Sequence, residues 1–425
     1  MTITIFMISL LGFMALGMPI AFALLACGVA LMLHMDSFDT QILAQNLLEG
    51  VNNYPLMAVP FFMLAGELMN AGGLSGRIVR VAEALVGHVR GGLGYAAIIT
   101  ALIIASISGS AVADTAAVAA MMMPMMRKAG YNVARSAGLI AAGGIIAPII
   151  PPSIAFVVFG VAAQVSVTKL FLAGIFPGLM MGMALALTWW MISKKEAPAI
   201  TQKFELDRLL KALLDGVWAL ILPLVIIGGM KFGVFTPTEA AVVSVIYSLF
   251  VGLFIYRGMT LKNLPELMLA AARTSSTIMF LVATAMVSAY LITIANIPSQ
   301  VTELLRPFMD NKILLMFVMM IIVIIVGTAL DLMPTVLILT PIMMPVVKQA
   351  GIDPVYFGVM FIMNNAIGLL TPPVGTVLNV AAGVAKTSLD SVIRGVWPFL
   401  LAQTILLFLF VLFPQLVMVP ASWFR

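Results

Sequence analysis

The chain has 425 residues, of which 63% are hydrophobic and only 9% are charged, and this composition excludes an ordinary soluble protein. The hydrocarbon core of a bilayer needs roughly 20 apolar residues per helix, so we expect an all-α polytopic membrane protein with about ten spans. The net charge of +5 comes from basic residues in short loops between apolar runs, which fits the positive-inside rule and includes no block typical of nucleic-acid binding.

The first half opens with an apolar run from residue 2 to 16 that we expect to remain as a first span. It lacks a basic leader region and a small-residue cleavage site, and a second apolar run follows it directly. The stretch 39–51 is too short and too polar to cross a membrane, and it predicts an arm helix lying in the interface. The stretch 259–273 has the same character and predicts a second interfacial arm helix.

The run 91–126 has a polar island of small residues at 106–115 and basic residues near both of its ends. Both ends are therefore expected on the cytoplasmic side of the membrane. A re-entrant hairpin with its tip at mid-membrane satisfies this condition, whereas a single helix over the whole run would be far too long. We interpret the run 313–347 in the same way, with its tip at 328–335.

Two other apolar runs, 136–165 and 354–385, are each interrupted by paired prolines, at 147–153 and at 371–376. Each interruption frees backbone carbonyls and amides that hydrocarbon cannot satisfy, so these groups must face protein, water or an ion. The sequence therefore predicts two broken helices in addition to the two hairpins.

The chain matches itself at a constant offset of 221 positions, at which Pro124 coincides with Pro345 and the proline pair 151–152 with the pair 372–373. We therefore predict two repeats, 1–200 and 213–425, joined by a cytoplasmic linker at 201–212. Five spans in each repeat would invert the second repeat relative to the first, so that its hairpin opens to the periplasm. This topology places six of the 22 basic residues on the outer side, namely Lys169, Lys231, Arg306, Lys312, Lys348 and Arg425.

Inverted repeats with broken helices are how secondary transporters build a binding site at the bilayer midplane. Carbonyl and hydroxyl oxygens suit a hard cation such as sodium, and the N-termini of half-helices suit an organic anion. Candidate residues for one sodium site are Ser106, Ser108, Ser110, Asp114 and Ser153. Those for the other are Thr328, Asp331, Thr335, Thr371, Gly375 and Thr376. Candidate substrate-binding residues are Ser110, Thr115, Pro152, Pro334, Thr335, Pro373 and Asn379.

These residues also have ordinary structural interpretations. Ser and Gly in membrane helices often serve only close packing, and a Pro-Pro pair can be a kink that neighbouring groups satisfy. A charged aspartate left unpaired in hydrocarbon is costly, so we expect Asp114 and Asp331 to meet an ion or a donor rather than only to cap a half-helix. The segment 383–387 lacks the spacing of a phosphate-binding loop, so we expect no enzyme activity and no cofactor, with an ion gradient as the energy source.

Several long motifs occur in the order found in one transporter family. They are Ser-Gly-Ser-Ala-Val-Ala-Asp-Thr at 108–115, Gly-Gly-Ile-Ile-Ala-Pro-Ile-Ile-Pro-Pro-Ser at 143–153, Phe-Thr-Pro-Thr-Glu-Ala-Ala at 235–241 and Leu-Thr-Pro-Pro-Val-Gly at 370–375. With these motifs the chain resembles, over essentially its whole length, the large DctM-type membrane subunit of tripartite ATP-independent periplasmic (TRAP) transporters. Within that family it is most similar to the branch that imports sugar acids such as 2,3-diketo-L-gulonate.

The resemblance implies a sodium-coupled importer in the bacterial inner membrane that receives an organic acid anion from a periplasmic binding protein. C4-dicarboxylates and sialic acid are the other substrate classes of the family. A small four-helix membrane subunit is implied as a partner and is expected here to be a separate polypeptide. The resemblance also implies an elevator mechanism, in which a transport domain carrying both hairpins slides against a scaffold formed by the outer spans and the arm helices. Sodium sites in that family lie where each hairpin tip meets its unwound helix, which supports the residues assigned above.

Two other functions remain open. A stand-alone sodium-coupled dicarboxylate carrier would share the hairpins but would need no binding protein, so uptake with sodium alone would favour it. Two intramembrane aspartates are also typical of an intramembrane aspartyl protease. Asp114 and Asp331 lack the Gly-x-Gly-Asp context of such an enzyme, and the repeats would then have no explanation.

Overall fold

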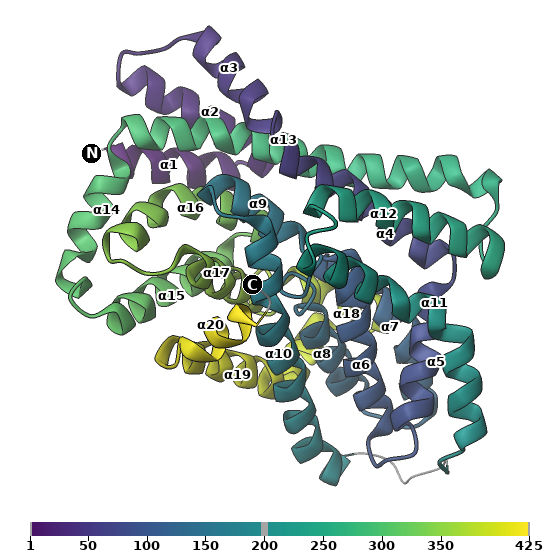
Figure 1. The fold of residues 1–425 in the computed structure, drawn as a ribbon. Helices are drawn as coiled ribbons and strands as arrows, with labels where there is room; N and C mark the ends of the chain where they lie inside the picture. Colours follow the sequence, from purple (N-terminus) through teal and green to yellow (C-terminus); the bar gives the residue numbers. More distant parts are fainter. Residues whose placement is uncertain (1, 197–202, 424–425) are drawn as a thin grey trace.

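The computed structural model describes residues 2–196 and 203–423, and every regular element within them is helical (Figure 1). The predicted all-α class is therefore confirmed. Seven of the described helices are long and apolar enough to cross a membrane, and the number rises to eight if one bent pair of helices counts as a single span. The chain is thus a multi-pass membrane protein. The division into ten spans stays a prediction, because the first two helices have only 14 and 15 residues.

Most helices of the first half follow the predicted runs, but α5 was not predicted. In chain order they are α1 (Thr2–Ala15), α2 (Ile20–His34), α3 (Thr40–Val51), the short η1 (Tyr54–Met57), α4 (Ala58–Ala71), α5 (Leu74–Val86), α6 (Gly92–Ser108), α7 (Ala111–Lys128), α8 (Val133–Gly144), α9 (Ile154–Ala163) and α10 (Val167–Glu196). Gly109 and Ser110 join α6 to α7 at the predicted hairpin tip. The predicted break at 147–153 lies in the irregular segment between α8 and α9.

The second half runs from α11 onward. Its helices are α11 (Leu206–Lys231), α12 (Pro237–Phe250), η2 (Val251–Ile255), η3 (Leu261–Asn263), α13 (Leu264–Ile294), α14 (Ile297–Leu305), η4 (Arg306–Phe308), α15 (Lys312–Ala329), α16 (Leu332–Gln349), α17 (Pro354–Gly368), α18 (Thr376–Ala385), α19 (Leu389–Leu412) and α20 (Gln415–Ser422). Leu330 and Asp331 join α15 to α16, and the second break separates α17 from α18. The bounds of α16 lie 221 positions after those of α7, which is the offset found in the sequence. Both breaks contain a cis Pro-Pro bond.

Short polar side chains explain where several of these helices begin. Asp39 accepts hydrogen bonds from the first backbone N–H groups of α3, and Asp353 does the same for α17. Thr236 and Glu239 form a reciprocal capping box at the start of α12. These side chains accept hydrogen bonds from backbone N–H groups that have no partner within the helix. The residues next to each helix start therefore determine where the helix begins.

One predicted boundary is wrong. The stretch 259–273, predicted as an interfacial arm helix, is η3 followed by the first part of α13, a continuous helix that extends to Ile294 and crosses the molecule in Figure 1. Its position in the interface stays a prediction. Neither glycine nor a further proline follows Pro265 within α13, so nothing in the chain interrupts the helix. In the first half, by contrast, the predicted arm helix α3 and the next helix α4 are separate, and Asn53 and Pro55 lie between them. The predicted linker 201–212 is also helical from Leu206 onward, and its residues 201 and 202 lie outside the described residues.

The helices pack into two groups. The helices α2, α3 and α4 pack with α13, and α4 also packs with α12. α1 packs against α2, and α11 packs against α12; we call these seven helices the outer group. The helices α6 to α10 pack with α15 to α19, and we call these ten helices the inner group. In Figure 1, α1, α2, α3 and α13 run along the upper edge of the molecule, and the inner group lies below them.

The inner group interlocks the two halves of the sequence. α8 packs along α19, and α7 packs along α18. The backbones of α8 and α19 touch, because a Cβ at Gly138 would lie 2.7 Å from the carbonyl carbon of Gly395. The ring of Phe159 packs against those of Phe357 and Phe361, with centroid distances of 6.3 and 5.8 Å. Both hairpin tips and both breaks therefore sit in one tightly packed set of helices.

Candidate functional site

The first hairpin tip lies against the first helix break. Gly109, at the tip, has a φ of +65°, which glycine adopts more easily than other residues. A Cβ at this position would lie 2.4 Å from the carbonyl oxygen of Pro152 and 3.1 Å from the Cα of Ser153. Both the backbone conformation and the lack of space thus require glycine here. The contact brings the tip at 108–115 next to the break at 147–153.

Asp114 is the buried charged residue of the first tip. Its Oδ1 accepts a hydrogen bond from Ser108 Oγ, and Ser108 Oγ accepts one from the Ser110 N–H at 3.2 Å. Ser110 also caps α7, because its Oγ accepts from the Ala113 N–H at 3.4 Å. The second carboxylate oxygen, Asp114 Oδ2, is buried and has no hydrogen-bond partner in the described part of the chain. A buried oxygen without a donor is an energetic cost that a bound cation would relieve.

Two further hydroxyl residues were predicted at this site. Thr115 follows Asp114 in the sequence, and Ser153 lies at the break. Ser153 Oγ donates to the Pro148 carbonyl at 2.5 Å and accepts from the Phe156 N–H at 3.1 Å, so it caps α9. Thr115 is fully buried, and its Oγ1 has no partner among the described residues. A Cβ at Gly144 would lie 1.8 Å from Thr115 Oγ1, so this hydroxyl rests directly on the backbone of α8. The first tip therefore holds a second buried oxygen, Thr115 Oγ1, that is able to accept a hydrogen bond.

Asp331 joins the second hairpin tip to the second break. Its Oδ1 accepts a hydrogen bond from the Thr376 Oγ1 at 3.3 Å, at the first residue of α18. Its backbone carbonyl accepts from the Thr335 Oγ1 at 2.8 Å. The Asp331 side chain does not cap α16, in contrast to Ser110 at the start of α7. The carboxylate is therefore available to a ligand between the tip and the break.

Sequence reasoning missed Asn364 and Asn365, which lie near the end of α17 and are buried. Asn364 Nδ2 donates to the Met320 carbonyl at 2.7 Å, and Asn365 Nδ2 donates to the Phe361 carbonyl at 2.8 Å. Both side-chain oxygens are buried without a partner within the described chain. Two consecutive asparagines inside an apolar run were the signal that could have identified this position.

The two halves supply these buried oxygens from opposite helices. At the offset of 221, Asn365 of α17 corresponds to Gly144 of α8, while Thr115 of α7 corresponds to Val336 of α16. A Cβ at Gly327 on α15 would lie 3.9 Å from Asn365 Oδ1, so this oxygen faces the second hairpin. Each half thus has an unpartnered oxygen between its hairpin and its broken helix. In the first half it is Thr115 Oγ1, which belongs to the hairpin, and in the second half it is Asn365 Oδ1, which belongs to the broken helix.

A cavity of about 170 Å³ lies between the hairpin tips and the outer group. The outer group contributes Met63 of α4 and Thr274 and Ile278 of α13. The inner group contributes Gly109, Ser110, Ala111, Val112, Pro148, Ile154, Ala155, Asp331, Leu332, Met333 and Leu369. Of the predicted residues, Ser110 and Asp331 line the cavity. The apolar lining and Thr274 were not predicted from the sequence.

Several other predicted residues make local contacts. Ser106 Oγ donates to the Ile103 carbonyl at 2.6 Å, and Thr328 Oγ1 donates to the Ile325 carbonyl at 2.7 Å. Such bonds to the preceding helical turn are common for hydroxyl residues and do not by themselves indicate a site. Two residues of the second half behave similarly, since Thr371 Oγ1 donates to the Ile367 carbonyl at 3.1 Å and Asn379 Nδ2 to the Val374 carbonyl at 2.9 Å. Pro334 is buried, whereas Pro373 and Asn379 are exposed.

Gly109→Ala is expected to lower the thermal stability of the purified protein. The positive φ alone costs an alanine about 1–2 kcal/mol, and the new Cβ would overlap the Pro152 carbonyl. Gly383→Ala is the matched control, because a Cβ at Gly383 of α18 would meet nothing within 4 Å. Thermal unfolding in detergent compares the two variants. Equal melting temperatures would show that the tip does not rest on the break.

Comparison with known proteins identifies a family. The sequence matches the family described as "Tripartite ATP-independent periplasmic transporter, DctM component" over residues 7–416. It is 56% identical over 423 residues to the 2,3-diketo-L-gulonate TRAP transporter large permease protein of Escherichia coli, and the match covers 100% of both chains. It is 36% identical over 405 residues to the sialic acid TRAP transporter large permease protein of Vibrio cholerae, covering 95% of each.

The fold is also similar to that of a solved structure. The YdaH transporter of Alcanivorax borkumensis superimposes with a TM-score of 0.62, and the match covers 88% of each chain. Only 13% of the residues are identical, so this likeness concerns the fold alone.

Proposed function

The chain belongs to the DctM family of tripartite ATP-independent periplasmic transporters, and we propose that it is the transport subunit of a sodium-coupled importer of an organic acid anion. The observation that carries this proposal is the cavity at which both hairpin tips and the first break meet. Its relatives are named transporter permeases, and we propose transport rather than catalysis for this chain as well.

The start of three helices at one cavity supports an anionic substrate. The first-turn residues Ala111 of α7, Ile154 of α9 and Leu332 of α16 all line it. Helix N-termini carry partial positive charge and free N–H donors, and both features favour a carboxylate. The described lining contains no lysine or arginine, so the backbone would supply the recognition. A substrate carboxylate is therefore expected to lie between the N-termini of these helices.

The acidic side chains explain why such an anion would need a cation. A substrate carboxylate in the cavity would face the carboxylate of Asp331, and like charges repel strongly away from water. The unpartnered oxygens of Asp114, Thr115, Asn364 and Asn365 are hard donors of the kind that suit sodium. We place one sodium ion at the first junction of tip and break, with Ser108 and Asp114, and one at the second, with Asp331 and Thr376.

We propose that the inner group moves against the outer group in an elevator-type cycle. The cavity lies at the border between the two groups. Met63, Thr274 and Ile278 come from the outer group, and the remaining lining comes from the inner group. The correspondence of the α7 and α16 bounds at the offset of 221 supports two repeats, at 1–200 and 213–425. We propose that these repeats have inverted topology and five spans each. Movement of the inner group would carry substrate and sodium past the outer group together.

A sugar acid is the substrate class that we favour, because a relative with 56% identity over its whole length is named for 2,3-diketo-L-gulonate. Sialic acid, for which another relative is named, and C4-dicarboxylates are the other classes. We also propose that the chain works in the bacterial inner membrane with a small four-helix membrane subunit and a periplasmic binding protein.

Uptake is expected to require the binding protein. Proteoliposomes that contain this chain and its small subunit would receive an inward sodium gradient and labelled 2,3-diketo-L-gulonate, with sialic acid and succinate as the other probes. We expect accumulation when the binding protein is present outside the vesicles and background uptake when it is omitted. Accumulation without the binding protein would instead favour a stand-alone sodium-coupled carrier.

A further inference from the structure

A second cavity of about 170 Å³ lies in the second half of the chain, where α15, α17 and α19 meet α20, and we call it the α15 cavity. It shares no lining residue with the cavity at the hairpin tips. The Tyr356 hydroxyl in its wall donates to the Phe410 carbonyl at 2.9 Å, so this group is already satisfied. Apolar cavities of this size exclude water and take up apolar guests. The residues that line the α15 cavity are Lys312, Ile313, Met316, Gly351, Ile352, Asp353, Tyr356, Val411, Pro414 and Met418.

The corresponding place in the first half is occupied by an indole ring. At the offset of 221, Lys312 and Ile352 correspond to Gly91 and Tyr131. Trp189 of α10 lies against both of these residues, because its Nε1 donates to the Gly91 carbonyl at 2.8 Å and its ring stacks on that of Tyr131 at 6.1 Å between centroids. A Cβ at Gly91 would lie only 2.9 Å from the indole nitrogen. The first half therefore has no free space at this position.

Smaller side chains explain why the second half leaves the space open. Ser166 and Ser388 each accept a hydrogen bond from the backbone N–H three residues later, at 3.4 Å, at the starts of α10 and α19. Ser388 lies 222 positions after Ser166, and Val411 lies 222 positions after Trp189. Val411, which lines the α15 cavity, thus corresponds to the indole of the first half. Valine and isoleucine replace the tryptophan and tyrosine, and their smaller volume leaves the cavity.

The α15 cavity opens onto a surface of large apolar side chains. Ile313 belongs to its lining and is 43% exposed. Leu412 and Phe413 lie between the lining residues Val411 and Pro414, and they are 53% and 54% exposed. Neighbouring apolar side chains that are exposed on a membrane protein face the hydrocarbon of the bilayer. An acyl chain of a lipid is therefore the apolar group that can reach the cavity.

Lys312 adds a positive charge to this apolar lining. Its Nζ donates to the Gly351 carbonyl at 2.8 Å, and no carboxylate among the described residues forms an ion pair with it. Asp353, the acidic residue of the lining, accepts instead from the backbone N–H groups of Val355 and Tyr356 at the start of α17. The ammonium group is therefore available to an anion from outside the chain.

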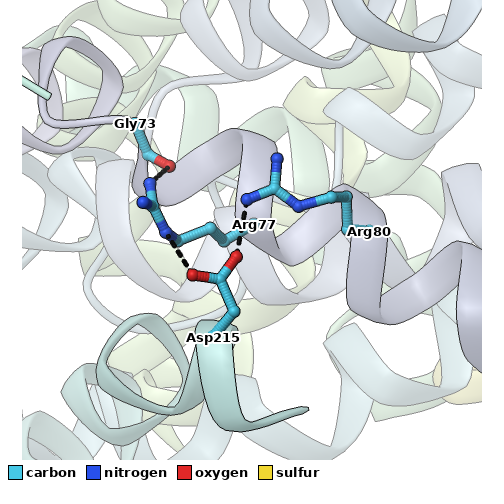
Figure 2. Close-up of polar contacts among 4 residues, drawn as sticks. All are labelled: Gly73, Arg77, Arg80 and Asp215. Carbon is cyan, nitrogen blue, oxygen red and sulfur yellow. Dashed lines mark hydrogen bonds and ion pairs between the residues drawn. The ribbon is translucent and has the colours of Figure 1, made fainter. Parts of the chain in front are cut away.

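Two arginines of α5 show the contrast. The Asp215 carboxylate lies between their guanidinium groups, as Figure 2 shows. Its Oδ1 lies 3.1 Å from Arg77 Nε, and its Oδ2 lies 2.7 Å from Arg80 Nη2. Both positive charges thus have a carboxylate partner within the protein, whereas the described partner of Lys312 is a neutral carbonyl.

We propose that the α15 cavity binds a phospholipid, with one acyl chain between Met316 and Val411 and the phosphate on the ammonium group of Lys312. Lys312 is the first residue of α15 and is predicted on the outer side of the membrane. A lysine at such a helix end reaches the level of the lipid phosphates. The acyl chain would occupy the space that Trp189 occupies in the first half. This inference does not depend on the proposed function, since it involves no transport.

A tryptophan in the cavity tests the proposal. The full chain would be purified in detergent, stripped of lipid and mixed with dioleoylphosphatidylglycerol, and native mass spectrometry would measure the bound lipid. Wild-type protein is expected to retain one molecule that Val411→Trp does not. The loss of affinity should be roughly tenfold or more, because excluding even two methylene groups has that effect. Leu412→Trp is the matched control, since Leu412 is exposed and does not line the cavity. Equal retention by Val411→Trp and wild type would overturn the inference.

Lys312→Gln tests the phosphate contact. Glutamine can still donate to the Gly351 carbonyl, and the apolar lining is unchanged, so this variant tests the site even where Val411→Trp does not fold. Its affinity for phosphatidylglycerol is expected to fall about fivefold. Lys348→Gln is the matched control, because Lys348 is exposed, is predicted on the same side and does not line the cavity. An equal loss in both variants, or no loss in Lys312→Gln, would contradict the contact.

Two smaller probes separate the parts of the ligand. Dioleoylglycerol has the acyl chains without the phosphate, and glycerol 3-phosphate has the phosphate without the chains. Each is expected to bind wild-type protein more weakly than phosphatidylglycerol does, and Lys312→Gln should leave the binding of dioleoylglycerol unchanged. Glycerol 3-phosphate that binds as tightly as the lipid would show a site for free phosphate esters and overturn the proposal. Dioleoylglycerol that binds as tightly would exclude a role for Lys312.

Discussion

A disulfide between α4 and the first hairpin is expected to reduce uptake to background. A Cβ at Gly66 of α4 would lie 3.5 Å from the Cβ of Ser108 on α6, which is a suitable separation for a disulfide. Gly66→Cys/Ser108→Cys would therefore join the outer group to the hairpin tip. Because an elevator cycle requires these two groups to slide past one another, the oxidised protein should be locked. The measurement is uptake of labelled 2,3-diketo-L-gulonate before and after oxidation.

The reduced form of the same protein is the first control, since it includes any loss caused by replacing Ser108. A cysteine pair within the inner group is the second. A Cβ at Gly182 of α10 would lie 2.7 Å from Leu102 Cδ1 of α6, so Leu102→Cys/Gly182→Cys joins two helices that are expected to move together. Oxidation should leave its uptake unchanged. Equal uptake by the oxidised and reduced forms of the Gly66/Ser108 pair would argue against sliding at this border.

Asp331→Asn is expected to lower uptake roughly 10- to 100-fold at a fixed sodium concentration, because a charge-assisted contact contributes about 1.5–3 kcal/mol. The substitution keeps the size of the side chain and its acceptor for the Thr376 hydroxyl, but it removes the negative charge beside the proposed sodium ion. The sodium concentration for half-maximal uptake should rise correspondingly. A sodium titration of the initial uptake rate measures both effects.

Asp353→Asn is the matched control for this variant. Asp353 caps α17 through its side chain and does not line the cavity, and asparagine caps a helix about as well as aspartate. The control should therefore keep the wild-type rate and sodium dependence. A wild-type sodium dependence in Asp331→Asn itself would refute the assignment of the second sodium site.

The helix ends near the site could be predicted from sequence because local chemistry encodes them. Polar islands and paired prolines cannot continue a helix through hydrocarbon, so both tips and both breaks were identifiable, and the offset of 221 linked them in pairs. The course of α13 could not be predicted in the same way. An amphipathic stretch followed by an apolar one fits either one long helix or two helices, and only the packing against α2, α3 and α4 distinguishes them.

The site itself was only partly predictable for a related reason. Sequence reasoning finds polar groups that hydrocarbon does not tolerate, which led to Ser110 and Asp331 but not to apolar lining such as Met63. It also treated all hydroxyl residues alike, although Ser106 and Thr328 bond to their own helical turns. Whether an oxygen is left without a partner depends on neighbours far away in the sequence. The contact between Arg77 and Asp215 has the same origin, since these residues are 138 positions apart.

Simultaneous measurement of sodium and substrate entry tests the central claim most directly. Proteoliposomes with the small subunit and the binding protein would receive radiolabelled sodium and labelled 2,3-diketo-L-gulonate, with wild-type and Asp331→Asn proteins compared side by side. The account predicts that substrate drives sodium entry in a fixed ratio in the wild type, and that Asp331→Asn needs more sodium for the same entry. Accumulation of substrate at the full rate after replacement of sodium by choline would contradict it.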